Sequence, residues 1–431
     1  MEKCAGCQER LARASYARSG KAWCVSHMAK HRVVIVGGGF GGIKAALELC
    51  KDKRFHITLV SDHPDMWIYG TFYHMATGGS RKVSSVPLSS IFSGKNVHVL
   101  NDRAVSIDKS INVVKTKVGH TLNYDALILA LGMRTNYFGI EGLEEYSLGI
   151  KSVSEAEELK AHIHKQLTED KERDLNYVVV GGGPTGVELA GALPSYIRSV
   201  AEKHGLPRRK VHVDLIEASS RLLPRLPKDI SLMVARHLRK LGIKIYLKTA
   251  VQAQTADALM VNSKPIQSHT VIWTAGMSNN VFFSDNQFQL SRSGKVRVDQ
   301  FLQHEPGIYV IGDNADTPYS GMAQTALYDG HYVAKNLVRL ADKESPEPYS
   351  AKKPIYVMPA GPNWAAVLWG KVRIYGRLGW ALRRVADLIA YHDYEPWNVA
   401  VSRFMAADEK EDSCLMCSDE LEKQNYLSGL V

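Results

Sequence analysis

Short apolar runs alternate with longer amphipathic stretches along most of the chain. Seven runs rich in Val, Ile and Leu have the length and composition of buried β-strands; they lie at residues 33–36, 56–60, 126–131, 177–180, 212–216, 270–273 and 308–311. Three stretches have the periodicity of helices packed on one face, at residues 44–50, 187–205 and 229–242. This alternation predicts an α/β fold with parallel sheets wound right-handed.

The plan occurs twice, because a glycine-rich turn follows the first run and returns about 144 residues later. Each copy has the spacing Gly-x-Gly-x-x-Gly between a strand and a helix. The glycines are Gly37, Gly39 and Gly42 in the first copy and Gly181, Gly183 and Gly186 in the second. The first glycine of such a turn permits a sharp bend, the second a close approach to a pyrophosphate, and the third close helix packing. Two copies predict two dinucleotide sites, with phosphates at the helix N-termini.

An acidic residue at the end of the next strand identifies the ribose end of such a site. After the second turn, Glu217 stands at that place, and its carboxylate favours NADH because it would repel a 2′-phosphate. After the first turn, Ser61 takes the position and Asp62 follows it. The first site therefore departs from the usual pattern, and both residues are candidates for cofactor binding.

Three further segments resemble those of flavoproteins with two dinucleotide sites. The segment that ends in Gly312 and Asp313 resembles the one that closes the FAD site near the ribityl chain and the pyrophosphate. The segments that end at Gly132 and Gly276 resemble the strand–turn segments by which the chain leaves and re-enters the FAD-binding domain. The resemblance implies that FAD occupies the first site and NADH visits the second.

Taken together, residues 31–340 resemble the type II NADH dehydrogenases, single-chain flavoproteins that pass electrons from NADH to a quinone. The resemblance implies two Rossmann-like dinucleotide-binding domains and a C-terminal module. Disulfide reductases and sulfide:quinone reductases are related, but both need cysteines in the catalytic half. No cysteine occurs between Cys50 and Cys414, which disfavours both.

The same resemblance assigns the reacting residues. Ala323 and Gln324 match the start of the family's AQxAxQ helix, which lies against the flavin and the quinone, and Tyr328 stands where a second Gln is expected. Thr77 matches the end of a segment that packs along the flavin. Glu188 matches the carboxylate that faces the nicotinamide and the flavin. The resemblance implies hydride transfer from NADH to FAD and delivery of two electrons to a quinone, without proton pumping.

The chain divides into five segments. Residues 1–30 form a cysteine-bearing extension, 31–150 the first part of the FAD-binding domain, 151–270 the NADH-binding domain, 271–340 the second part of the FAD-binding domain, and 341–431 a C-terminal module. A polar, proline-containing stretch separates the last two.

The C-terminal module has the features of a surface-binding helix. From Arg373, leucine, valine and isoleucine recur at helical spacing among arginines and aromatic residues, at Leu378, Leu382, Val385 and Ile389. Such a helix can lie in the head-group plane of an anionic membrane, and the alternative is packing on the body or in a homodimer. No run reaches the ~18 apolar residues of a membrane span, and the N-terminus lacks a signal peptide. We expect a cytoplasmic protein peripheral to the inner face of a membrane.

The N-terminal extension has the spacing of a zinc site. Two pairs with two-residue internal spacing can supply three thiolates and one imidazole to a tetrahedral ion; they are Cys4, Cys7, Cys24 and His27. The alternatives are a redox-active thiol pair and inert cysteines. A further pair, Cys414 and Cys417, lies near the other end of the chain.

Charge and composition leave the choice of partner open. The net charge of +10 favours anionic neighbours, including acidic lipids and phosphorylated cofactors. Nucleic acid is not expected, because aromatic and basic residues do not interleave as they do in binding modules. Two alternatives to a quinone reductase remain at this point: an NADH-dependent reductase of a protein or thiol acceptor, and a non-catalytic flavin redox sensor.

Overall fold

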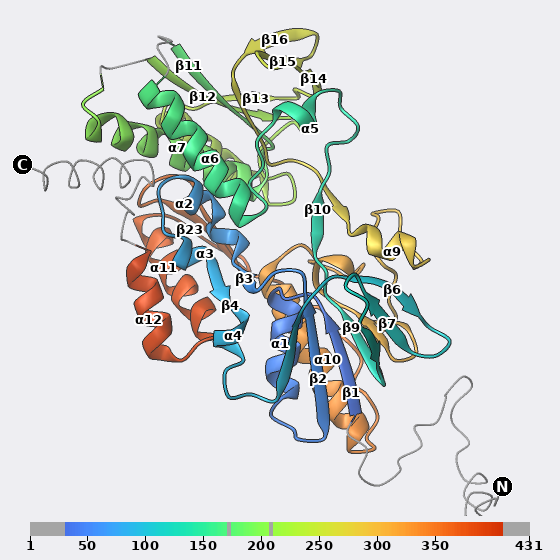
Figure 1. The fold of residues 1–431 in the computed structure, drawn as a ribbon. Helices are drawn as coiled ribbons and strands as arrows, with labels where there is room; N and C mark the ends of the chain where they lie inside the picture. Colours follow the sequence, from blue (N-terminus) through green and yellow to red (C-terminus); the bar gives the residue numbers. More distant parts are fainter. Residues whose placement is uncertain (1–30, 170–173, 207–209, 408–431) are drawn as a thin grey trace, which may run out of the picture.

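The structure, a computed structural model, describes residues 31–169, 174–206 and 210–407. Its described part contains two sheets built mainly of parallel strands, in the first of which the edge strand β19 is antiparallel, and a C-terminal module (Figure 1). The sheet near the N-terminus and the second sheet lie at opposite ends of the view, and the module of α11 (Arg377–His392) and α12 (Trp397–Ala406) lies beside both. The α/β fold with two Rossmann-like units that the pattern predicts is confirmed.

The first sheet has six strands in the order β19-β20-β9-β1-β2-β5. Their bounds are β19 Gln303–Glu305, β20 Ile308–Val310, β9 Ala126–Leu129, β1 His31–Val36, β2 Phe55–Ser61 and β5 Val97–Asn101. Strand β1 pairs in parallel with β2 and β9, so that the turn after it opens at the middle of the sheet. Val33 and Ile35 face one core and Val34 and Val36 the other, as the period of two along a buried strand requires.

Different elements pack on the two faces of this sheet. Helices α1 (Phe40–Leu49) and α10 (Ala323–Ala341) pack side by side on one face. The other face packs against α9 (Val281–Asp285) and a small antiparallel sheet. That sheet consists of β6 Ala104–Asp108, β7 Val113–Thr116 and β8 Thr121–Asn123.

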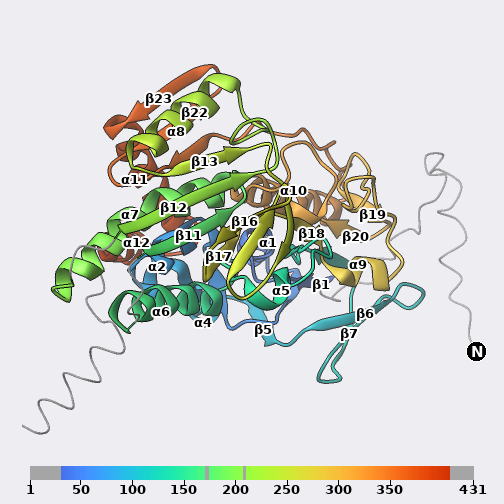
Figure 2. The same ribbon diagram turned by 90° about the horizontal axis from the view of Figure 1, so that it is seen from above.

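The second sheet has four parallel strands in the order β13-β12-β11-β17. Their bounds are β13 Lys244–Leu247, β12 Lys210–Glu217, β11 Asp174–Val180 and β17 Thr270–Trp273. One face is covered by α6 Val153–Glu169, α7 Pro184–Lys203 and α8 Lys228–Lys240. The other face is covered by the meander of β14 Val251–Gln254, β15 Ala258–Val261 and β16 Lys264–Gln267 (Figure 2).

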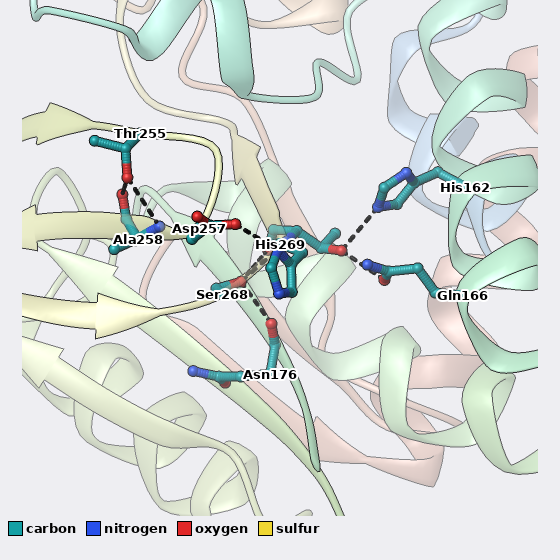
Figure 3. Close-up of polar contacts among 9 residues, drawn as sticks. His162, Gln166, Asn176, Thr255, Asp257, Ala258, Ser268 and His269 are labelled. Carbon is teal, nitrogen blue, oxygen red and sulfur yellow. Dashed lines mark hydrogen bonds and ion pairs between the residues drawn. The ribbon is translucent and has the colours of Figure 1, made fainter. Parts of the chain in front are cut away.

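Polar contacts fix α6 on the edge strand β17. The Thr270 hydroxyl donates to Gln166 Oε1 at 2.7 Å and lies 2.9 Å from His162 Nε2, so that two residues one turn apart hold one side chain. Figure 3 shows His162 and Gln166 reaching this point from α6, while Ser268 bonds the Asn176 carbonyl at 2.6 Å. The network lies where β17 begins, whereas ligands of such sheets bind at the carboxyl ends of the strands. Its role is therefore structural.

The chain crosses between the two sheets twice, through strands that pair with each other. β10 (Met133–Thr135) leads out and β18 (Met277–Asn279) leads back, and the two form an antiparallel ladder. Because β17 continues to Trp273 in the second sheet, the return begins a few residues after the boundary at 271 expected from the sequence.

The C-terminal module joins the antiparallel strands β21 (Tyr356–Pro359), β22 (Ala365–Trp369) and β23 (Val372–Gly376) to α11 and α12. The helix expected from Arg373 begins at Arg377, because residues 372–376 pair with β22. Short elements complete the described chain: β3 Asp65–Trp67, η1 Tyr69–Thr71, α2 Phe72–Ala76, α3 Arg81–Ser84, β4 Ser85–Pro87, α4 Leu88–Ile91, α5 Leu143–Tyr146 and η2 Gly312–Asn314. Among the described residues, no helix combines the length and apolar composition needed to cross a bilayer.

Candidate functional site

The first glycine turn links β1 to α1 and has the expected division of roles. Gly37 has φ +119°, and a methyl group added there would lie 2.1 Å from the Ala130 carbonyl oxygen. A methyl group on Gly42 would lie 2.0 Å from the Gly37 carbonyl oxygen, so the helix can pack on the turn only with glycine there. Gly39, the N-cap of α1, has no atom within 4 Å of an added methyl position. The turn is therefore closed on the protein side and open at its middle glycine.

The second turn, between β11 and α7, repeats this geometry. Gly181 has φ +118°, and a methyl group on Gly186 would lie 1.9 Å from the Gly181 carbonyl oxygen. Gly183 again has no atom within 4 Å of an added methyl position. Pro184 follows as the first helical residue, where its fixed φ suits the helix and its missing N–H is not needed.

Both turns fit the pyrophosphate of a dinucleotide. Each places the free N–H groups of a helix N-terminus beside backbone that carries no side chain. No side chain provides the cap at Gly39 or Gly183, so an anion has direct access to these N–H groups. The residues predicted from the glycine spacing are thus brought into two equivalent sites on two sheets.

Glu217 ends β12 beside the second turn. Its Oε2 accepts the Gly182 N–H at 2.7 Å and its Oε1 accepts the Ser219 N–H at 2.6 Å. These bonds fix a carboxylate at the edge of the turn. From this position it can accept hydrogen bonds from ribose hydroxyls and repel a 2′-phosphate.

The corresponding position of the first turn is occupied differently. Ser61 ends β2, is buried, and its hydroxyl donates to the His63 carbonyl at 2.8 Å. A methyl group on Gly38 would lie 2.5 Å from this hydroxyl oxygen, so Ser61 borders the turn as Glu217 borders the second. Asp62 points to the surface, where it pairs with Arg103 at 3.1 Å. Ser61 is therefore better placed than Asp62 for the role that the sequence left between them.

A buried network holds the segment at Gly312, which the sequence predicts to close the first site. Asp329 on α10 is fully buried; it accepts the Gly312 N–H at 3.0 Å and the Tyr349 hydroxyl at 2.7 Å. Burial raises the pKa of Asp329 to about 6. Asn314 accepts the Gly132 N–H at 2.8 Å and donates to the Gly132 carbonyl at 2.7 Å. Two segments expected at the FAD site are thus bonded to each other.

Asp313 lies at the end of this segment, before the helix that carries the acceptor motif. Its Oδ1 accepts the Gly321 N–H at 3.1 Å, and burial raises its pKa. Ala323 is the first residue of α10. Gly276 lies at the crossing between the sheets, where an added methyl group would be 2.3 Å from the Asn136 carbonyl oxygen.

Thr77 follows the last residue of α2, a helix that packs against α7. Its hydroxyl donates to the Tyr73 carbonyl at 2.8 Å. The following Gly78 has φ +92°, and a methyl group there would lie 3.1 Å from the Tyr196 ring. The predicted contact of Thr77 with the flavin stays a prediction, while its bond to α2 is structural.

Glu188 on α7 is buried beside charges from two other segments. Its Oε1 lies 3.7 Å from Nη1 of Arg383 on α11. Burial raises the pKa of Glu188 to about 8; Asp387 acts in the same direction, and Arg383 and Lys151 oppose it. The partly buried ring of Tyr73 lies in the same group. Burial without a hydrogen-bonded counter-charge therefore favours the protonated form of this carboxyl group.

The two residues predicted to face the quinone, Gln324 and Tyr328, have partners within the protein. Gln324 Nε2 donates to the Ile355 carbonyl at 2.9 Å, and its Oε1 accepts the Ile355 N–H at 3.0 Å. Lys352 Nζ lies 4.3 Å from the centre of the Tyr328 ring. Gln324 would have to release a bond to Ile355 before its amide could bind a substrate, so its predicted role is not visible in this arrangement.

The predicted zinc ligands lie outside the described residues, as does the second cysteine pair. Within residues 31–169, 174–206 and 210–407, no group of three or more His, Cys, Asp or Glu side chains is arranged to hold a metal ion. Cys50, the one cysteine in those ranges, is a free thiol that donates to the Leu47 carbonyl.

Several residues of the site escaped the sequence-based reasoning. Arg383 is one of the arginines of the predicted surface-binding helix, and it is only 8% exposed and reaches into the protein. The others are Asp387, Asp329, Asn314 and Lys151. Their positions depend on contacts between distant segments, and the only local signal was a charged residue at an otherwise apolar position of a helix.

Comparisons with known proteins agree with this geometry. The model of the pyridine nucleotide-disulphide oxidoreductase family matches residues 31–330. The type II NADH:quinone oxidoreductase of Mycobacterium tuberculosis is 32% identical over 336 residues, which cover 72% of each chain. The type II NADH:quinone oxidoreductase of Staphylococcus aureus strain NCTC 8325 is 26% identical over 344 residues, 74% of this chain and 85% of the relative.

Solved structures share the fold at lower identity. NDH2 from Plasmodium falciparum in complex with NADH superposes with a TM-score of 0.77 at 17% identity, covering 88% of this chain and 97% of the other. The sulfide:quinone oxidoreductase of Aquifex aeolicus gives a TM-score of 0.72 at 21% identity, covering 86% and 91%.

Proposed function

The chain belongs to the pyridine nucleotide-disulphide oxidoreductase family and, within it, to the type II NADH:quinone oxidoreductases, and from this we propose that it oxidises NADH and reduces a quinone through bound FAD. The alternatives of a protein or thiol acceptor and of a redox sensor find no support in the relatives. The reaction converts NADH, a quinone and one proton into NAD⁺ and a quinol.

The pair of glycine turns carries this proposal. Gly39 and Gly183 both stand at helix N-termini with open space in front of them, on two sheets joined by the β10–β18 crossing. Two such turns in one chain suit one dinucleotide that stays and one that exchanges. We assign FAD to the turn at Gly39 and NADH to the turn at Gly183, because Glu217 borders the second.

The residues of the chain bind and orient the two nucleotides, and one of them holds a proton. When bound, FAD supplies the two-electron chemistry that no side chain here can perform. The first turn, Ser61 and the segment at Asp313 would hold it. The second turn and Glu217 would hold NADH with its nicotinamide toward Glu188. Because NADH brings one hydrogen of the two that a quinol needs, Glu188 is suited to supply the second as a proton.

The quinone end of the site is proposed on α10. Gln324 and Tyr328 occupy the family's motif positions on its first turns. Both side chains contact the segment that leads into β21, through Ile355 and Lys352. We therefore place the acceptor beside this segment, where movement of residues 352–355 would free the Gln324 amide.

We further propose that the C-terminal module binds the inner face of an anionic membrane. On α11, Leu378, Val385 and Ile389 are each more than half exposed and lie on one stripe. The β22–β23 turn and α12 of the same module carry further large exposed apolar side chains; they are Trp369, Val372, Trp397, Val401 and Met405. An apolar surface of this kind with basic residues fits a head-group layer. A homodimer is the competing occupant.

Stopped-flow mixing of the purified protein tests the proposed reaction. NADH is expected to bleach the flavin absorbance, NADPH to do so much more slowly, and a soluble ubiquinone analogue to restore it. A preparation that contains FAD but is not bleached by NADH would overturn the function. Rapid bleaching without recovery by any quinone would leave NADH oxidation intact and reject the acceptor.

A further inference from the structure

Arg383 connects Glu188 to a second carboxylate on α11, Asp387. The guanidinium Nε donates to both oxygens of Asp387, at 2.8 and 2.9 Å, and Nη2 donates to the Gly70 carbonyl at 2.9 Å. The contact with Glu188 is longer, 3.7 Å, which is an ion-pair distance without a hydrogen bond. The strong bonds of this cation are thus made to Asp387 and to the backbone.

This division decides which carboxyl group is charged. Arg383 and the side chain of Glu188 are almost inaccessible, with side chains 10% exposed, whereas the Asp387 side chain is 27% exposed. A buried carboxylate is stable only when it is paired and hydrogen-bonded. Asp387, four residues from Arg383 on the same helix, is closer to water and takes the cation, so Glu188 lacks a hydrogen-bonded counter-charge.

Charges on the neighbouring segments do not supply Glu188 with the missing counter-charge. Lys151, before α6, also acts on Glu188, but its positive charge is shared with Glu155 and Asp313, and burial lowers its pKa. From α2, Tyr73 contributes a neutral phenol whose pKa is raised by burial. His74, next to it, is partly buried, and desolvation lowers its pKa, so it adds no charge at neutral pH.

We propose that Asp387 is a positioning residue that keeps Arg383 away from Glu188 and thereby keeps Glu188 protonated for turnover. The inference rests on the proposed function and deepens it. In the reaction, the C4–H bond of NADH breaks and supplies two electrons and one hydrogen. The Glu188 O–H bond breaks and supplies the second proton, a second O–H bond of the quinol forms, and a solvent proton restores the acid.

The Asp387→Asn variant tests this arrangement. Removal of the competing charge lets the guanidinium pair with Glu188, and an opposite charge at close range lowers the pKa of a carboxyl group by about 1 to 3 units. The carbonyl stretch of protonated Glu188, assigned by its loss in Glu188→Gln, is followed by infrared titration. We expect it to disappear at a pH lower by at least about one unit in Asp387→Asn, with the alkaline limb of NADH:quinone turnover moving equally. Asp387→Glu should restore the wild-type titration.

A second arginine–carboxylate pair in the same module provides the control. Arg403 donates to both oxygens of Glu395 at 2.8 Å, and Glu395 is not among the charges that act on Glu188. Glu395→Gln should leave the Glu188 band where it is in the wild type.

Two results would overturn the inference. One is a Glu188 band that titrates at the same pH in Asp387→Asn as in the wild type. The other is a wild-type protein in which Glu188 is already ionised at pH 7, a measurement that requires no variant at position 387 to fold. The infrared titration does not depend on turnover. A protein that reduces quinone normally but fails these tests would therefore refute the role of Asp387 and leave the proposed function standing.

Discussion

Replacing Gly183 with alanine tests whether the second turn holds a pyrophosphate. Gly183 has φ −75° and ψ −178°, which alanine adopts without strain, and no protein atom lies within 4 Å of the added methyl group. We therefore expect the stability of the folded protein to stay within about 1 kcal/mol of the wild type, because the freedom lost by the unfolded chain offsets the poorer capping of α7 by alanine.

The Gly183→Ala substitution is expected to weaken only the binding of NADH. The methyl group occupies the space through which the phosphate reaches the N–H groups of α7, and a hydrogen bond to a charged group contributes about 1.5–3 kcal/mol. Loss of one such bond weakens binding about 10- to 100-fold. The NADH concentration that gives half-maximal rate of flavin bleaching should rise by this factor, while the FAD content of the purified protein stays unchanged.

Gly39→Ala is the matched control, since it places the same group at the same point of the other turn. It should lower retention of FAD and leave NADH binding to the second turn unaffected. Gly186→Ala should instead destabilise the fold, because its methyl group would lie 1.9 Å from the Gly181 carbonyl oxygen. An unchanged NADH dependence in a well-folded Gly183→Ala protein would refute the assignment of NADH to this turn.

Four other expectations can be measured independently. Glu188→Gln should flatten the pH dependence of the free energy of unfolding. As pH rises from about 4.5 to about 8, the wild type should lose up to about 5 kcal/mol of stability relative to this variant, because its unfolded chain releases a proton that folded Glu188 retains. Denaturant titrations of both proteins over this pH range would show the difference, and an equal pH dependence of the two unfolding free energies would contradict it. Glu217→Ser should lower the ratio of kcat/KM for NADH over NADPH at least about tenfold, since a charge that repels the 2′-phosphate is gone; unchanged discrimination rules out its ribose role. Leu378→Asp combined with Ile389→Asp should abolish cosedimentation with anionic phospholipid vesicles and spare reduction of a soluble quinone, whereas conversion of a dimer to a monomer would indicate the competing interface. Asp329→Ala leaves a backbone N–H and a tyrosine hydroxyl without their acceptor, so unfolding free energy should fall by about 2–6 kcal/mol and FAD should dissociate faster; unaltered FAD release would separate Asp329 from the cofactor segment.

Local patterns were sufficient for the two turns but not for the chemistry between them. The glycine spacing specifies Gly37–Gly42 and Gly181–Gly186 because the bend, the open middle position and the helix contact all lie within six residues. The place of Glu217 beside the second turn was also predictable, since it follows from the length of one strand–helix–strand unit.

Contacts between segments that are distant in the sequence could not be predicted from local patterns. Arg383 is 195 residues from Glu188, and its place in an apparently basic helix suggested exposure rather than burial. The apolar periodicity begins at Leu378 and does not fix where the helix starts, whereas residues 372–376 pair with β22, a contact that depends on tertiary structure. Likewise, Gln324 matched a motif, but its amide is bound to the backbone of a segment that follows α10.

The crossing formed by β10 and β18 has a consequence for modularity. Met133–Thr135 and Met277–Asn279 lie side by side, so the whole second domain is inserted into the first through two adjacent joints. An insertion with neighbouring ends can be exchanged without stretching its host. A domain that recognises another nucleotide could be grafted at these joints, provided that its surface retained the packing against α2 and the C-terminal sheet.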